Sequence, residues 1–512
     1  MIYGQDATPK DLVLRADLCV VGSGAGGSVI AKKAAERGLK VVVLEEGGYY
    51  TKQDFDQLER DMLPKLYKDR TGQATADGFF SVLQGRCVGG TTVVNYLCCF
   101  RTPDRVLREW AERGVQGMGP AEMKPHLDEV WDVLSIKKMP EEMLNRNNRV
   151  LKIGGDKLGW KGDTFWRNQI GCWGSGFCAE GCVYDAKQSA LLTYLHEAVI
   201  RGADIYAGAR VERITVENGR ATGVEGITWD PETDTPRGTL RVKADVTVVA
   251  CGSINTPELL LRSNVGGPMV GKSLYLHPVP LVWALFDEEI HNYYGIKQGY
   301  HIDEFSDVFN DNLDGGFLLE GVGAQPGLGS VGMHHYGTWH RERMKENDKL
   351  ALTAVLVRDR DGGTVSLDKS GHRKIEYWPS ARDMKQCTEG MKRTAEAYLA
   401  AGAKEVYTCH VKETVIRSPK EIAVIDQRGT APGELLLFSA HQMGTCRMGE
   451  DPKISVVNSN GRVHTTKSLL VADASTFPTP SGVNPQVTVY GVATHHAKHL
   501  LENWSDVAAG KA

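Results

Sequence analysis

The sequence predicts a protein of mixed α/β and α+β class, in which a Rossmann-like dinucleotide-binding domain is joined to a second domain built on an antiparallel sheet. A glycine-rich turn between two short apolar runs near the N-terminus predicts the first domain. Strand-like stretches that alternate with acidic loops in the middle of the chain predict the second. A length of 512 residues is too great for one ordinary core and agrees with two or more domains.

The first predicted element is a complete βαβ unit. Residues 17–22, DLCVVG, form a short apolar run typical of a buried parallel strand, and LKVVVLEE, residues 39–46, forms the next strand. Between them, Gly22-Ser23-Gly24-Ala25-Gly26-Gly27 fits the G-x-G-x-x-G pattern, which lets the backbone approach a pyrophosphate at a helix N-terminus. Glu45 can then accept hydrogen bonds from a ribose. The motif predicts dinucleotide binding and does not by itself distinguish FAD from NAD.

The remaining elements predict three segments. Residues 1–276 form the first part of the dinucleotide-binding domain, with insertions over 54–187. Residues 277–432 form the second domain, which includes the strands LVWALF and ALTAVLV and a long helix over 382–403. Residues 433–512 return to the first domain and complete it, and Pro485 marks the start of a helix.

Composition excludes several classes of protein. A formal net charge of −4, without a basic stripe along the sequence, gives no reason to expect nucleic acid as a partner. No run of about 18 apolar residues predicts a transmembrane segment, and the N-terminus does not resemble a signal peptide. Eleven cysteines, mostly scattered singly, favour free thiols in a reducing compartment, so we expect a cytoplasmic protein.

Four sequence blocks resemble the glucose–methanol–choline (GMC) oxidoreductases in order and spacing, and in particular the bacterial alcohol- and sterol-oxidising branch. They are the βαβ unit with LEEGG, the block GRCVGGTT with Asn95 after it, the block GSINTPELL, and the block HQMGTCRMG with the later VADAS and GVNP. The resemblance covers nearly all of the chain. It implies an FAD-binding domain with a substrate domain, and FAD as the cofactor.

The resemblance also implies the cofactor-binding residues. The first block would hold the adenosine half, the backbone of Val211 would meet the adenine, and Gly89 to Asn95 would pass beside the isoalloxazine. Asp473 would lie near the pyrophosphate and the ribityl chain. The full predicted set is Gly22, Gly24, Ala25, Gly27, Glu45, Glu46, Arg86, Gly89, Gly90, Thr91, Asn95, Val211, Asp473, Asn484 and Pro485.

The same resemblance implies His441 and Asn484 as the catalytic pair. Removing a hydride from a carbinol carbon also requires a base for the hydroxyl proton, and histidine suits this because its pKa lies near neutrality. We therefore expect His441 to take the proton and Asn484 to orient the substrate oxygen. The alternatives are a hydrogen-bonded core histidine and, for Asn484, a helix cap before Pro485. A cluster of His495, His496 and His499 favours packing over metal binding because no carboxylate motif accompanies it.

A loop with Cys172, Cys178 and Cys182 leaves three alternatives open. The thiols are free and packed beside the flavin, or they ligate an iron–sulfur cluster, or two of them form a disulfide. An iron–sulfur cluster is less favoured than free thiols, because the loop offers only three cysteine ligands and no C-x-x-C pair. Lys187 follows the loop, and its role does not emerge from the sequence.

The predicted function is an FAD-dependent oxidoreductase that oxidises the CH–OH group of an alcohol to an aldehyde or ketone by hydride transfer to the flavin. The electron acceptor is oxygen or a quinone. Two alternatives stay open: an FAD-containing lyase or decarboxylase on the same scaffold, or a sugar-type dehydrogenase subunit that passes electrons to a partner. Aromatic residues of the second domain are candidates for the substrate pocket or for its core: Trp283, Tyr293, Tyr294, Tyr336 and Trp339.

Overall fold

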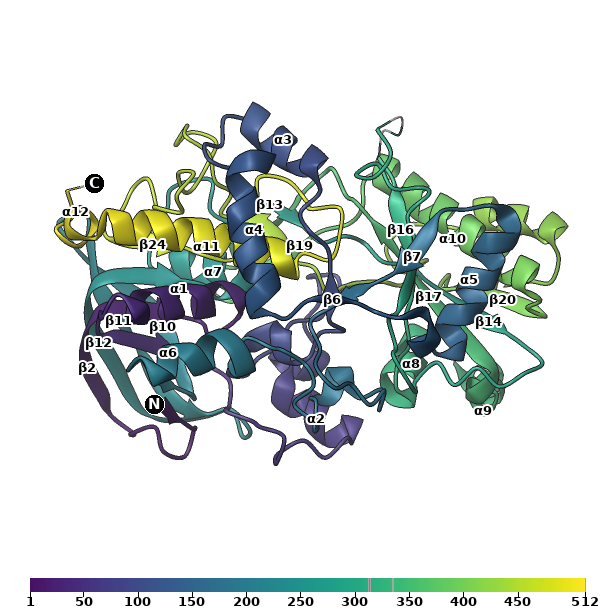
Figure 1. Ribbon diagram of the computed structural model, residues 1–512, viewed down its shortest axis with the longest axis horizontal. Coiled ribbons are helices and arrows are strands. Elements are labelled where there is room, and N and C mark those ends of the chain that lie inside the picture. The colour runs from purple at the N-terminus through teal and green to yellow at the C-terminus, as the bar shows by residue number, and fades with distance from the viewer. Residues whose placement is uncertain (312, 314, 334–335, 512) are drawn as a thin grey trace.

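Two large sheets, each with helices packed against it, form the two halves of the chain's fold (Figure 1). The computed structural model describes residues 1–311, 313, 315–333 and 336–511. The first sheet lies at the left of the view and the second at the right, and the N- and C-terminal ends of the chain both lie beside the first sheet. The predicted fold class, an FAD-type α/β domain with an antiparallel-sheet domain, is confirmed.

The first sheet has eight strands in the order β1-β9-β3-β2-β12-β11-β10, with β24 also paired to β12. Strands β2 (Leu12–Val21) and β3 (Val41–Leu44) are parallel neighbours, and α1 (Ala25–Glu36) connects them. The predicted βαβ unit is therefore confirmed. The other strands are β1 (Ile2–Tyr3), β9 (Asp204–Tyr206), β10 (Ala209–Glu217), β11 (Arg220–Asp230), β12 (Thr235–Val249) and β24 (Leu469–Val471).

The second sheet has seven strands in the order β21-β20-β14-β17-β16-β15-β7. Its central strand β17 (Leu350–Val357) is buried along its whole length, because α10 (Ala381–Ala401) and α5 (Arg146–Leu158) pack on the sheet. The remaining strands are β7 (Gly162–Thr164), β14 (Leu281–Leu285), β15 (Tyr300–Ile302), β16 (Phe317–Gly321), β20 (Glu405–Thr408) and β21 (Val415–Ile416). All pairings in this sheet are antiparallel, as predicted.

The predicted domain boundaries need one correction. We expected 54–187 to belong wholly to the first domain, but β7 pairs with β15 and α5 packs against α10, so residues 146–164 belong to the second sheet. The physical reason is that α5 is amphipathic and buries Val150 and Leu151 against the second core. Sequence order therefore does not follow the division into domains here.

Three small sheets join the halves and bring distant segments together. Strand β13 (Lys272–Tyr275) pairs with β23 (Met443–Thr445), and β22 (Leu437–Ser439) pairs with β4 (Phe80–Val82). These pairings place His441, between β22 and β23, next to the segment that follows β4. The other strands are β5 (Cys98–Cys99), β6 (Lys137–Lys138), β8 (Trp166–Arg167), β18 (Gly363–Leu367) and β19 (Arg373–Glu376).

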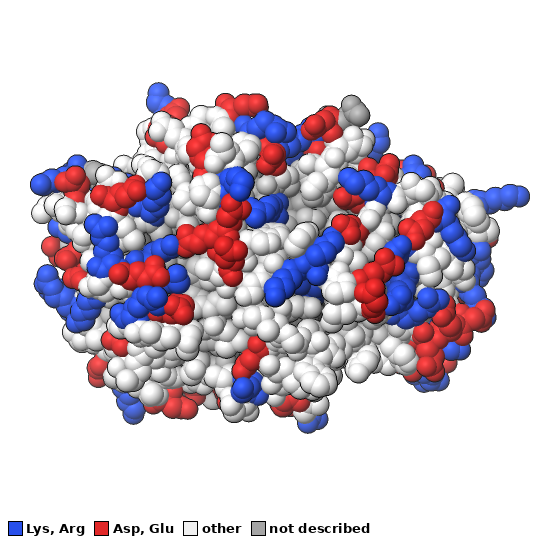
Figure 2. Space-filling model, in the orientation of Figure 1, with Lys and Arg blue, Asp and Glu red and all other residues white. Residues whose placement is uncertain are grey.

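The remaining helices lie over the sheets and in the connections. They are α2 (Glu59–Leu66), α3 (Asp104–Glu112), α4 (Pro120–Val133), α6 (His196–Ile200), α7 (Gly252–Arg262), α8 (Pro326–Gly332), α9 (Gly337–Lys345), α11 (Gln486–Glu502) and α12 (Trp504–Ala508). None of those that the structure describes is long and apolar enough to cross a bilayer. Figure 2 shows basic and acidic side chains interspersed over the visible face.

Helix α11 carries a group of histidines into the core between α1 and α4. His495 and His496 are buried, and the His495 ring lies 4.5 Å from that of His499 and 5.6 Å from that of His126 on α4. Across the described residues, no group of three potential ligands is arranged to hold a metal ion. Burial lowers the pKa of His495 to about 2 and that of His496 to about 3.

We expect these histidines to make stability depend on acid pH. A buried histidine with a lowered pKa stays neutral in the folded chain while the unfolded chain takes up a proton below about 6.5, so stability is complete above that pH and falls as the pH drops toward 3. His496→Gln should therefore reduce the loss of unfolding free energy between pH 7 and 5 by up to about 2 kcal/mol. Urea unfolding at both pH values measures it. The exposed His372→Gln is the control, and equal pH dependence in both variants would contradict the prediction.

Candidate active site

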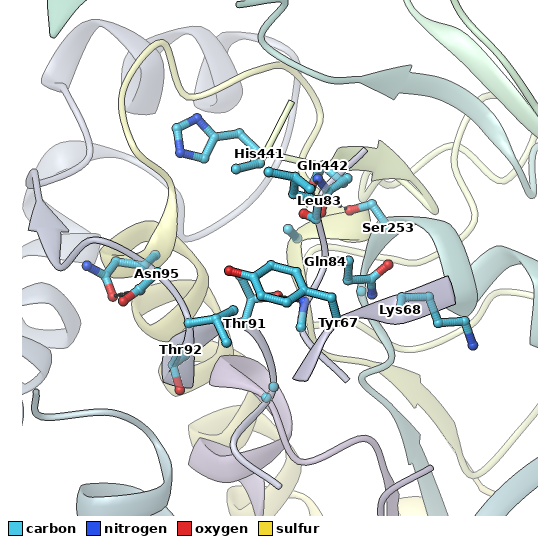
Figure 3. Close-up of a pocket in the computed structure, with 18 of the residues that line it drawn as sticks. Tyr67, Lys68, Leu83, Gln84, Thr91, Thr92, Asn95, Ser253, His441 and Gln442 are labelled. Carbon is cyan, nitrogen blue, oxygen red and sulfur yellow. Dashed lines mark hydrogen bonds between the residues drawn. The ribbon is translucent and has the colours of Figure 1, made fainter. Parts of the chain in front are cut away.

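One continuous cavity of about 550 Å³ runs from the glycine-rich turn before α1 to His441 and Asn484. Its volume lies within the range of known cofactor and substrate sites. Figure 3 shows Thr91 and Asn95 on one side of this space and His441 with Gln442 on the other. Residues from both domains line the cavity, so it is the candidate active site.

The glycines of the turn lack a side chain for two different reasons, and together these suit a nucleotide-binding turn. A Cβ at Gly22 would lie 2.4 Å from the Ala250 carbonyl oxygen, and one at Gly27 would lie 2.0 Å from that of Gly22. Both glycines permit close packing of backbone on backbone. A Cβ at Gly24 would meet nothing nearer than the Gly90 Cα at 4.0 Å, so Gly24 leaves open space on the cavity side. FAD, the cofactor that the resemblance implies, needs that space.

The acids that follow β3 lie at the end of the cavity beside the glycine-rich turn. The Glu45 carboxylate accepts hydrogen bonds from the Ser23 N–H at 3.1 Å, from its hydroxyl at 2.6 Å and from the Gly47 N–H at 2.9 Å. Burial raises the pKa of Glu45. Burial also acts against ionisation of Glu46, but the Lys68 ammonium 2.7 Å away outweighs it and brings the pKa of Glu46 to about 2. Both carboxylates line the cavity.

The structure places most of the predicted cofactor residues on the cavity wall and three of them behind it. The residues on the wall are Gly22, Gly24, Ala25, Glu45, Glu46, Gly90, Thr91, Asn95, Val211, Asp473, Asn484 and Pro485. Gly27 serves packing, and the Gly89 N–H donates to the Ser23 hydroxyl at 3.0 Å. The Arg86 guanidinium binds Asp234 and the Pro231 carbonyl and lies over the Trp229 ring, and Arg86 is not among the residues that line the cavity.

Asp473 organises the middle of the cavity through its own hydrogen bonds. Its carboxylate accepts from the Gly252 N–H at 2.8 Å, the Thr256 hydroxyl at 2.6 Å and the Ser475 N–H at 2.8 Å. Asp473 thus joins the start of α7 to the segment after β24. Burial raises the pKa of this carboxyl, and its hydrogen bonds oppose that rise. Its place on the wall agrees with the position that the resemblance implies.

Three polar side chains meet at the far end of the cavity: His441, Asn484 and Glu320. The Asn484 amide nitrogen lies 3.5 Å from His441 Nε2 and donates to Glu320 Oε2 at 3.4 Å. Asn484 Oδ1 and Glu320 Oε1 are buried and have no hydrogen-bond partner among the described residues. Buried polar atoms without partners mark a place where a ligand or water binds. Because both residues line the cavity, the two oxygens are candidates for contact with a bound molecule.

A hydrogen-bond chain behind His441 connects its ring to His277 and to the backbone of Gly482. The Gly482 N–H donates to His277 Nε2 at 3.2 Å, and His277 Nδ1 lies 3.4 Å from His441 Nδ1. Burial lowers the pKa of His277 well below its usual value and that of His441 to about 4, so both rings are neutral at pH 7. A neutral His277 that accepts from Gly482 carries its hydrogen on Nδ1 and can donate it to His441 Nδ1, which would leave the hydrogen of His441 on Nε2. In that tautomer the Asn484 amide nitrogen, 3.5 Å from Nε2, faces a second donor and makes no hydrogen bond to the ring.

Glu320 is a candidate functional residue that sequence reasoning missed. It lies on β16 and is 1% exposed, and the Gln298 amide donates to its Oε2 at 2.5 Å. Burial raises the pKa of Glu320 to about 7, against the effect of the two amide hydrogen bonds. The available signal was a single carboxylate in an otherwise apolar buried strand, FLLEG.

Beyond the polar end, the cavity becomes an apolar chamber between the two sheets. Trp283 lines the cavity, which agrees with the alternative of a pocket role for this residue. Tyr67, Tyr96 and Phe438 also line it and were not predicted to do so. Tyr293, Tyr294, Tyr336 and Trp339 lie outside its wall. Its apolar lining comes from β14, β17, α8 and their neighbours: Val279, Leu281, Val322, Ala324, Leu328, Val331, Leu352, Ala354, Leu356, Leu436 and Leu437.

The cysteine loop holds free thiols. Cys172, Cys178 and Cys182 are partly exposed and, like the other eight cysteines, are not paired in disulfides. In the part of the chain that the structure describes, these three do not form a group that could hold a metal ion. Of the three alternatives for this loop, the free-thiol one therefore agrees with the structure.

Comparisons with known proteins agree with this architecture. Residues 18–279 and 359–493 match the N- and C-terminal family models described as GMC oxidoreductase. An uncharacterised GMC-type oxidoreductase of Mycobacterium tuberculosis is 35% identical over 486 residues, which are 94% of this chain and 75% of that protein. A long-chain-alcohol oxidase of Arabidopsis thaliana is 32% identical, over 96% of this chain and 69% of its own.

Solved structures share the fold. Pyridoxine 4-oxidase from Mesorbium loti superposes with a TM-score of 0.69 at 18% identity, over 95% of this chain and 99% of its own. A mutant formate oxidase of Aspergillus oryzae superposes with a TM-score of 0.70 at 16% identity, over 98% of this chain and 100% of its own. At these identities the likeness concerns the fold.

Two glycine variants should separate cofactor binding from folding. Gly24→Ala adds a methyl group that projects only into the cavity, so the apoprotein should keep its unfolding free energy while FAD binds at least tenfold more weakly. Gly27→Ala forces Cβ against the Gly22 carbonyl and should destabilise the fold by about 1–3 kcal/mol. Urea unfolding without FAD and FAD titration by fluorescence quenching measure both quantities. A Gly24→Ala protein with unchanged FAD affinity would contradict the assignment of this space.

Proposed function

Because the chain belongs to the GMC oxidoreductase family, we propose that it is an FAD-dependent enzyme that oxidises the CH–OH group of an apolar alcohol to an aldehyde or ketone. The observation that carries the proposal is a single cavity with a glycine cradle at one end and three polar side chains at the other, followed by an apolar chamber. FAD, when bound, supplies the acceptor for the hydride of the carbinol carbon.

The cavity supports an alcohol with a long aliphatic or other apolar body. Leu352, Ala354 and Leu356 project from one face of β17 into the chamber, opposite the polar end where the hydroxyl would bind. Burial of each methylene in such a chamber contributes about 0.8 kcal/mol to binding. The related long-chain-alcohol oxidase of Arabidopsis thaliana agrees with this substrate class.

At the polar end of the cavity, three residues would each act on the substrate hydroxyl group. His441 carries its hydrogen on Nε2 and donates it to the substrate oxygen, while the Asn484 amide holds the same oxygen in place. Glu320 has an unpartnered oxygen and a pKa of about 7, so its carboxylate takes the hydroxyl proton. The sequence-based prediction gave this proton to His441, and the hydrogen-bond chain through His277 favours Glu320 instead.

Oxygen or a quinone would take the electrons in the second half of the cycle, and the relatives that act as oxidases favour oxygen. The alternative of a subunit that passes electrons through a cysteine-bound cluster lacks support from the thiol arrangement among the described residues. A lyase or decarboxylase on the same scaffold would bind FAD, but an alcohol would not reduce that FAD.

Anaerobic addition of a primary long-chain alcohol should bleach the flavin absorbance if the protein is an alcohol-oxidising enzyme. A flavin that no alcohol bleaches would reject the proposed function.

The pH profile should show which group takes the proton. If Glu320 is the base, it must be a carboxylate, so kcat/KM should rise through a pH of about 7 and level off above it. Glu320→Gln should lower kcat about 10²–10⁴-fold and remove this rise. A histidine with a pKa of about 4 would instead give a flat profile above pH 5. Steady-state rates from pH 5 to 9 measure this profile. A flat wild-type profile would contradict Glu320 as the base and favour His441.

Chain-length selectivity tests the apolar chamber. Ala354→Phe fills part of the chamber from β17, so kcat/KM for 1-dodecanol should fall at least tenfold more than for 1-butanol. Ala354→Val, which adds less volume, should have a smaller effect of the same kind. Melting temperatures serve as the control for folding. An equal loss for both alcohols would place the aliphatic chain elsewhere.

A further inference from the structure

Lys187, which follows the cysteine loop, has a buried side chain directed at three backbone carbonyls. Its side chain is buried, and Nζ donates hydrogen bonds of 2.7 Å to the carbonyl oxygens of Val93, Asn95 and Cys178. Two of these carbonyls belong to the flavin-side segment and the third to the cysteine loop. The ammonium therefore ties together two segments that are about 80 residues apart in the sequence.

Lys187 is not neutralised by a partner acid. Of the carboxylates in the part of the chain that the structure describes, none forms a salt bridge with it, and its three hydrogen bonds all go to backbone carbonyls. Burial lowers the pKa of Lys187 to about 8, against the effect of the nearby Cys178, Cys182 and Glu180, which leaves most of it charged at neutral pH. A buried lysine without a salt-bridge partner is costly to keep, which points to a role beyond packing.

The carbonyl groups that Lys187 binds determine where the opposite ends of their peptides point. A trans peptide is planar, and its N–H points away from its C=O. With their carbonyls on Lys187, the Asn95–Tyr96 and Cys178–Ala179 peptides direct the N–H groups of Tyr96 and Ala179 away from the ammonium. Tyr96 and Ala179 both line the cofactor cavity. Neither N–H donates a hydrogen bond to another residue of the described chain.

We propose that Lys187 is a positioning residue for the cofactor: it fixes these two peptides so that the N–H groups of Tyr96 and Ala179 face the isoalloxazine of FAD. The peptide of the third carbonyl, that of Val93, differs because its N–H already has a partner within the loop. The Val94 N–H donates to the Thr91 carbonyl at 3.1 Å. This inference rests on the proposed FAD cofactor and adds to it the groups that hold the ring.

The arrangement should also tune the flavin. An ammonium bound to a carbonyl polarises the whole peptide, so the N–H at its other end becomes a stronger donor. Fixed donors and a nearby positive charge stabilise negative charge without reorganisation, and two-electron reduction adds negative charge to the flavin ring. Lys187 should therefore raise the reduction potential of the bound flavin.

The test measures that potential in the FAD-loaded protein. Lys187→Met keeps the length of the side chain and removes the charge, and we expect its reduction equilibrium to be at least tenfold less favourable, which is about 30 mV for a two-electron couple. Lys187→Arg retains the charge and should recover most of the loss. Lys32→Met is the matched control, because Lys32 is also largely buried but lies on α1 in a salt bridge with Glu36. Dye-coupled reduction in the absence of substrate gives the potentials.

A second pair of variants tests the N–H group itself. Ala179→Pro removes the N–H while Lys187 and its three carbonyl bonds remain, whereas Ala179→Gly keeps the N–H. FAD should dissociate at least tenfold more readily from Ala179→Pro than from Ala179→Gly, and this comparison decides the matter even if Lys187→Met does not fold. Unchanged potential in Lys187→Met, or equal FAD affinity in the two Ala179 variants, overturns the inference. A wild-type protein that binds no FAD would instead overturn the proposed function.

Discussion

Close approach of two backbone segments at the N-terminus of α1 is the constraint on which the site depends. A Cβ at Gly26 would lie 1.7 Å from the Ala472 carbonyl oxygen, so the turn and the segment after β24 touch with no room for a side chain. The first of these segments begins the nucleotide cradle, and the second leads through Asp473 to Asn484. The contact therefore brings the two segments together at the cavity, although Gly26 and Ala472 are 446 positions apart in the sequence.

The catalytic end is held in the same way, by contacts between segments that are far apart in the chain. Arg358, at the end of β17, donates to the Pro480 carbonyl and to the carboxylates of Asp307 and Glu109. Pro480 lies just before Gly482, whose N–H orients His277. A residue of the second domain thus supports the loop that carries Asn484, and the domain interface and the tautomer of His441 become parts of one buried network.

Much of the fold and about half of the site follow from the sequence, for physical reasons that differ by residue. The βαβ unit was predictable because apolar runs, glycines and Glu45 lie in one short window and act locally. Residues 146–164 were not, because only tertiary packing of α5 assigns them to the second sheet. The direction of the Arg86 side chain was not predictable, because a motif preserves order in the chain but not the direction of a side chain. Glu320 and Lys187 were beyond reach, because their roles come from burial and from partners contributed by other segments.

Two residues whose roles the sequence did not reveal carry opposite charges near the same cavity: Glu320 lines it, and Lys187 binds the carbonyls of Asn95 and Cys178 outside its wall. A buried carboxylate at Glu320 is disfavoured by desolvation, which raises its pKa to about 7 and makes it suitable for accepting a proton. Burial likewise disfavours the ammonium of Lys187, yet three carbonyls at 2.7 Å keep it in place beside the flavin-side segment. Loss of a proton and of a hydride from one alcohol requires a base on the substrate side and stabilisation of negative charge on the acceptor side. In the proposed mechanism, Glu320 would meet the first requirement and Lys187 the second.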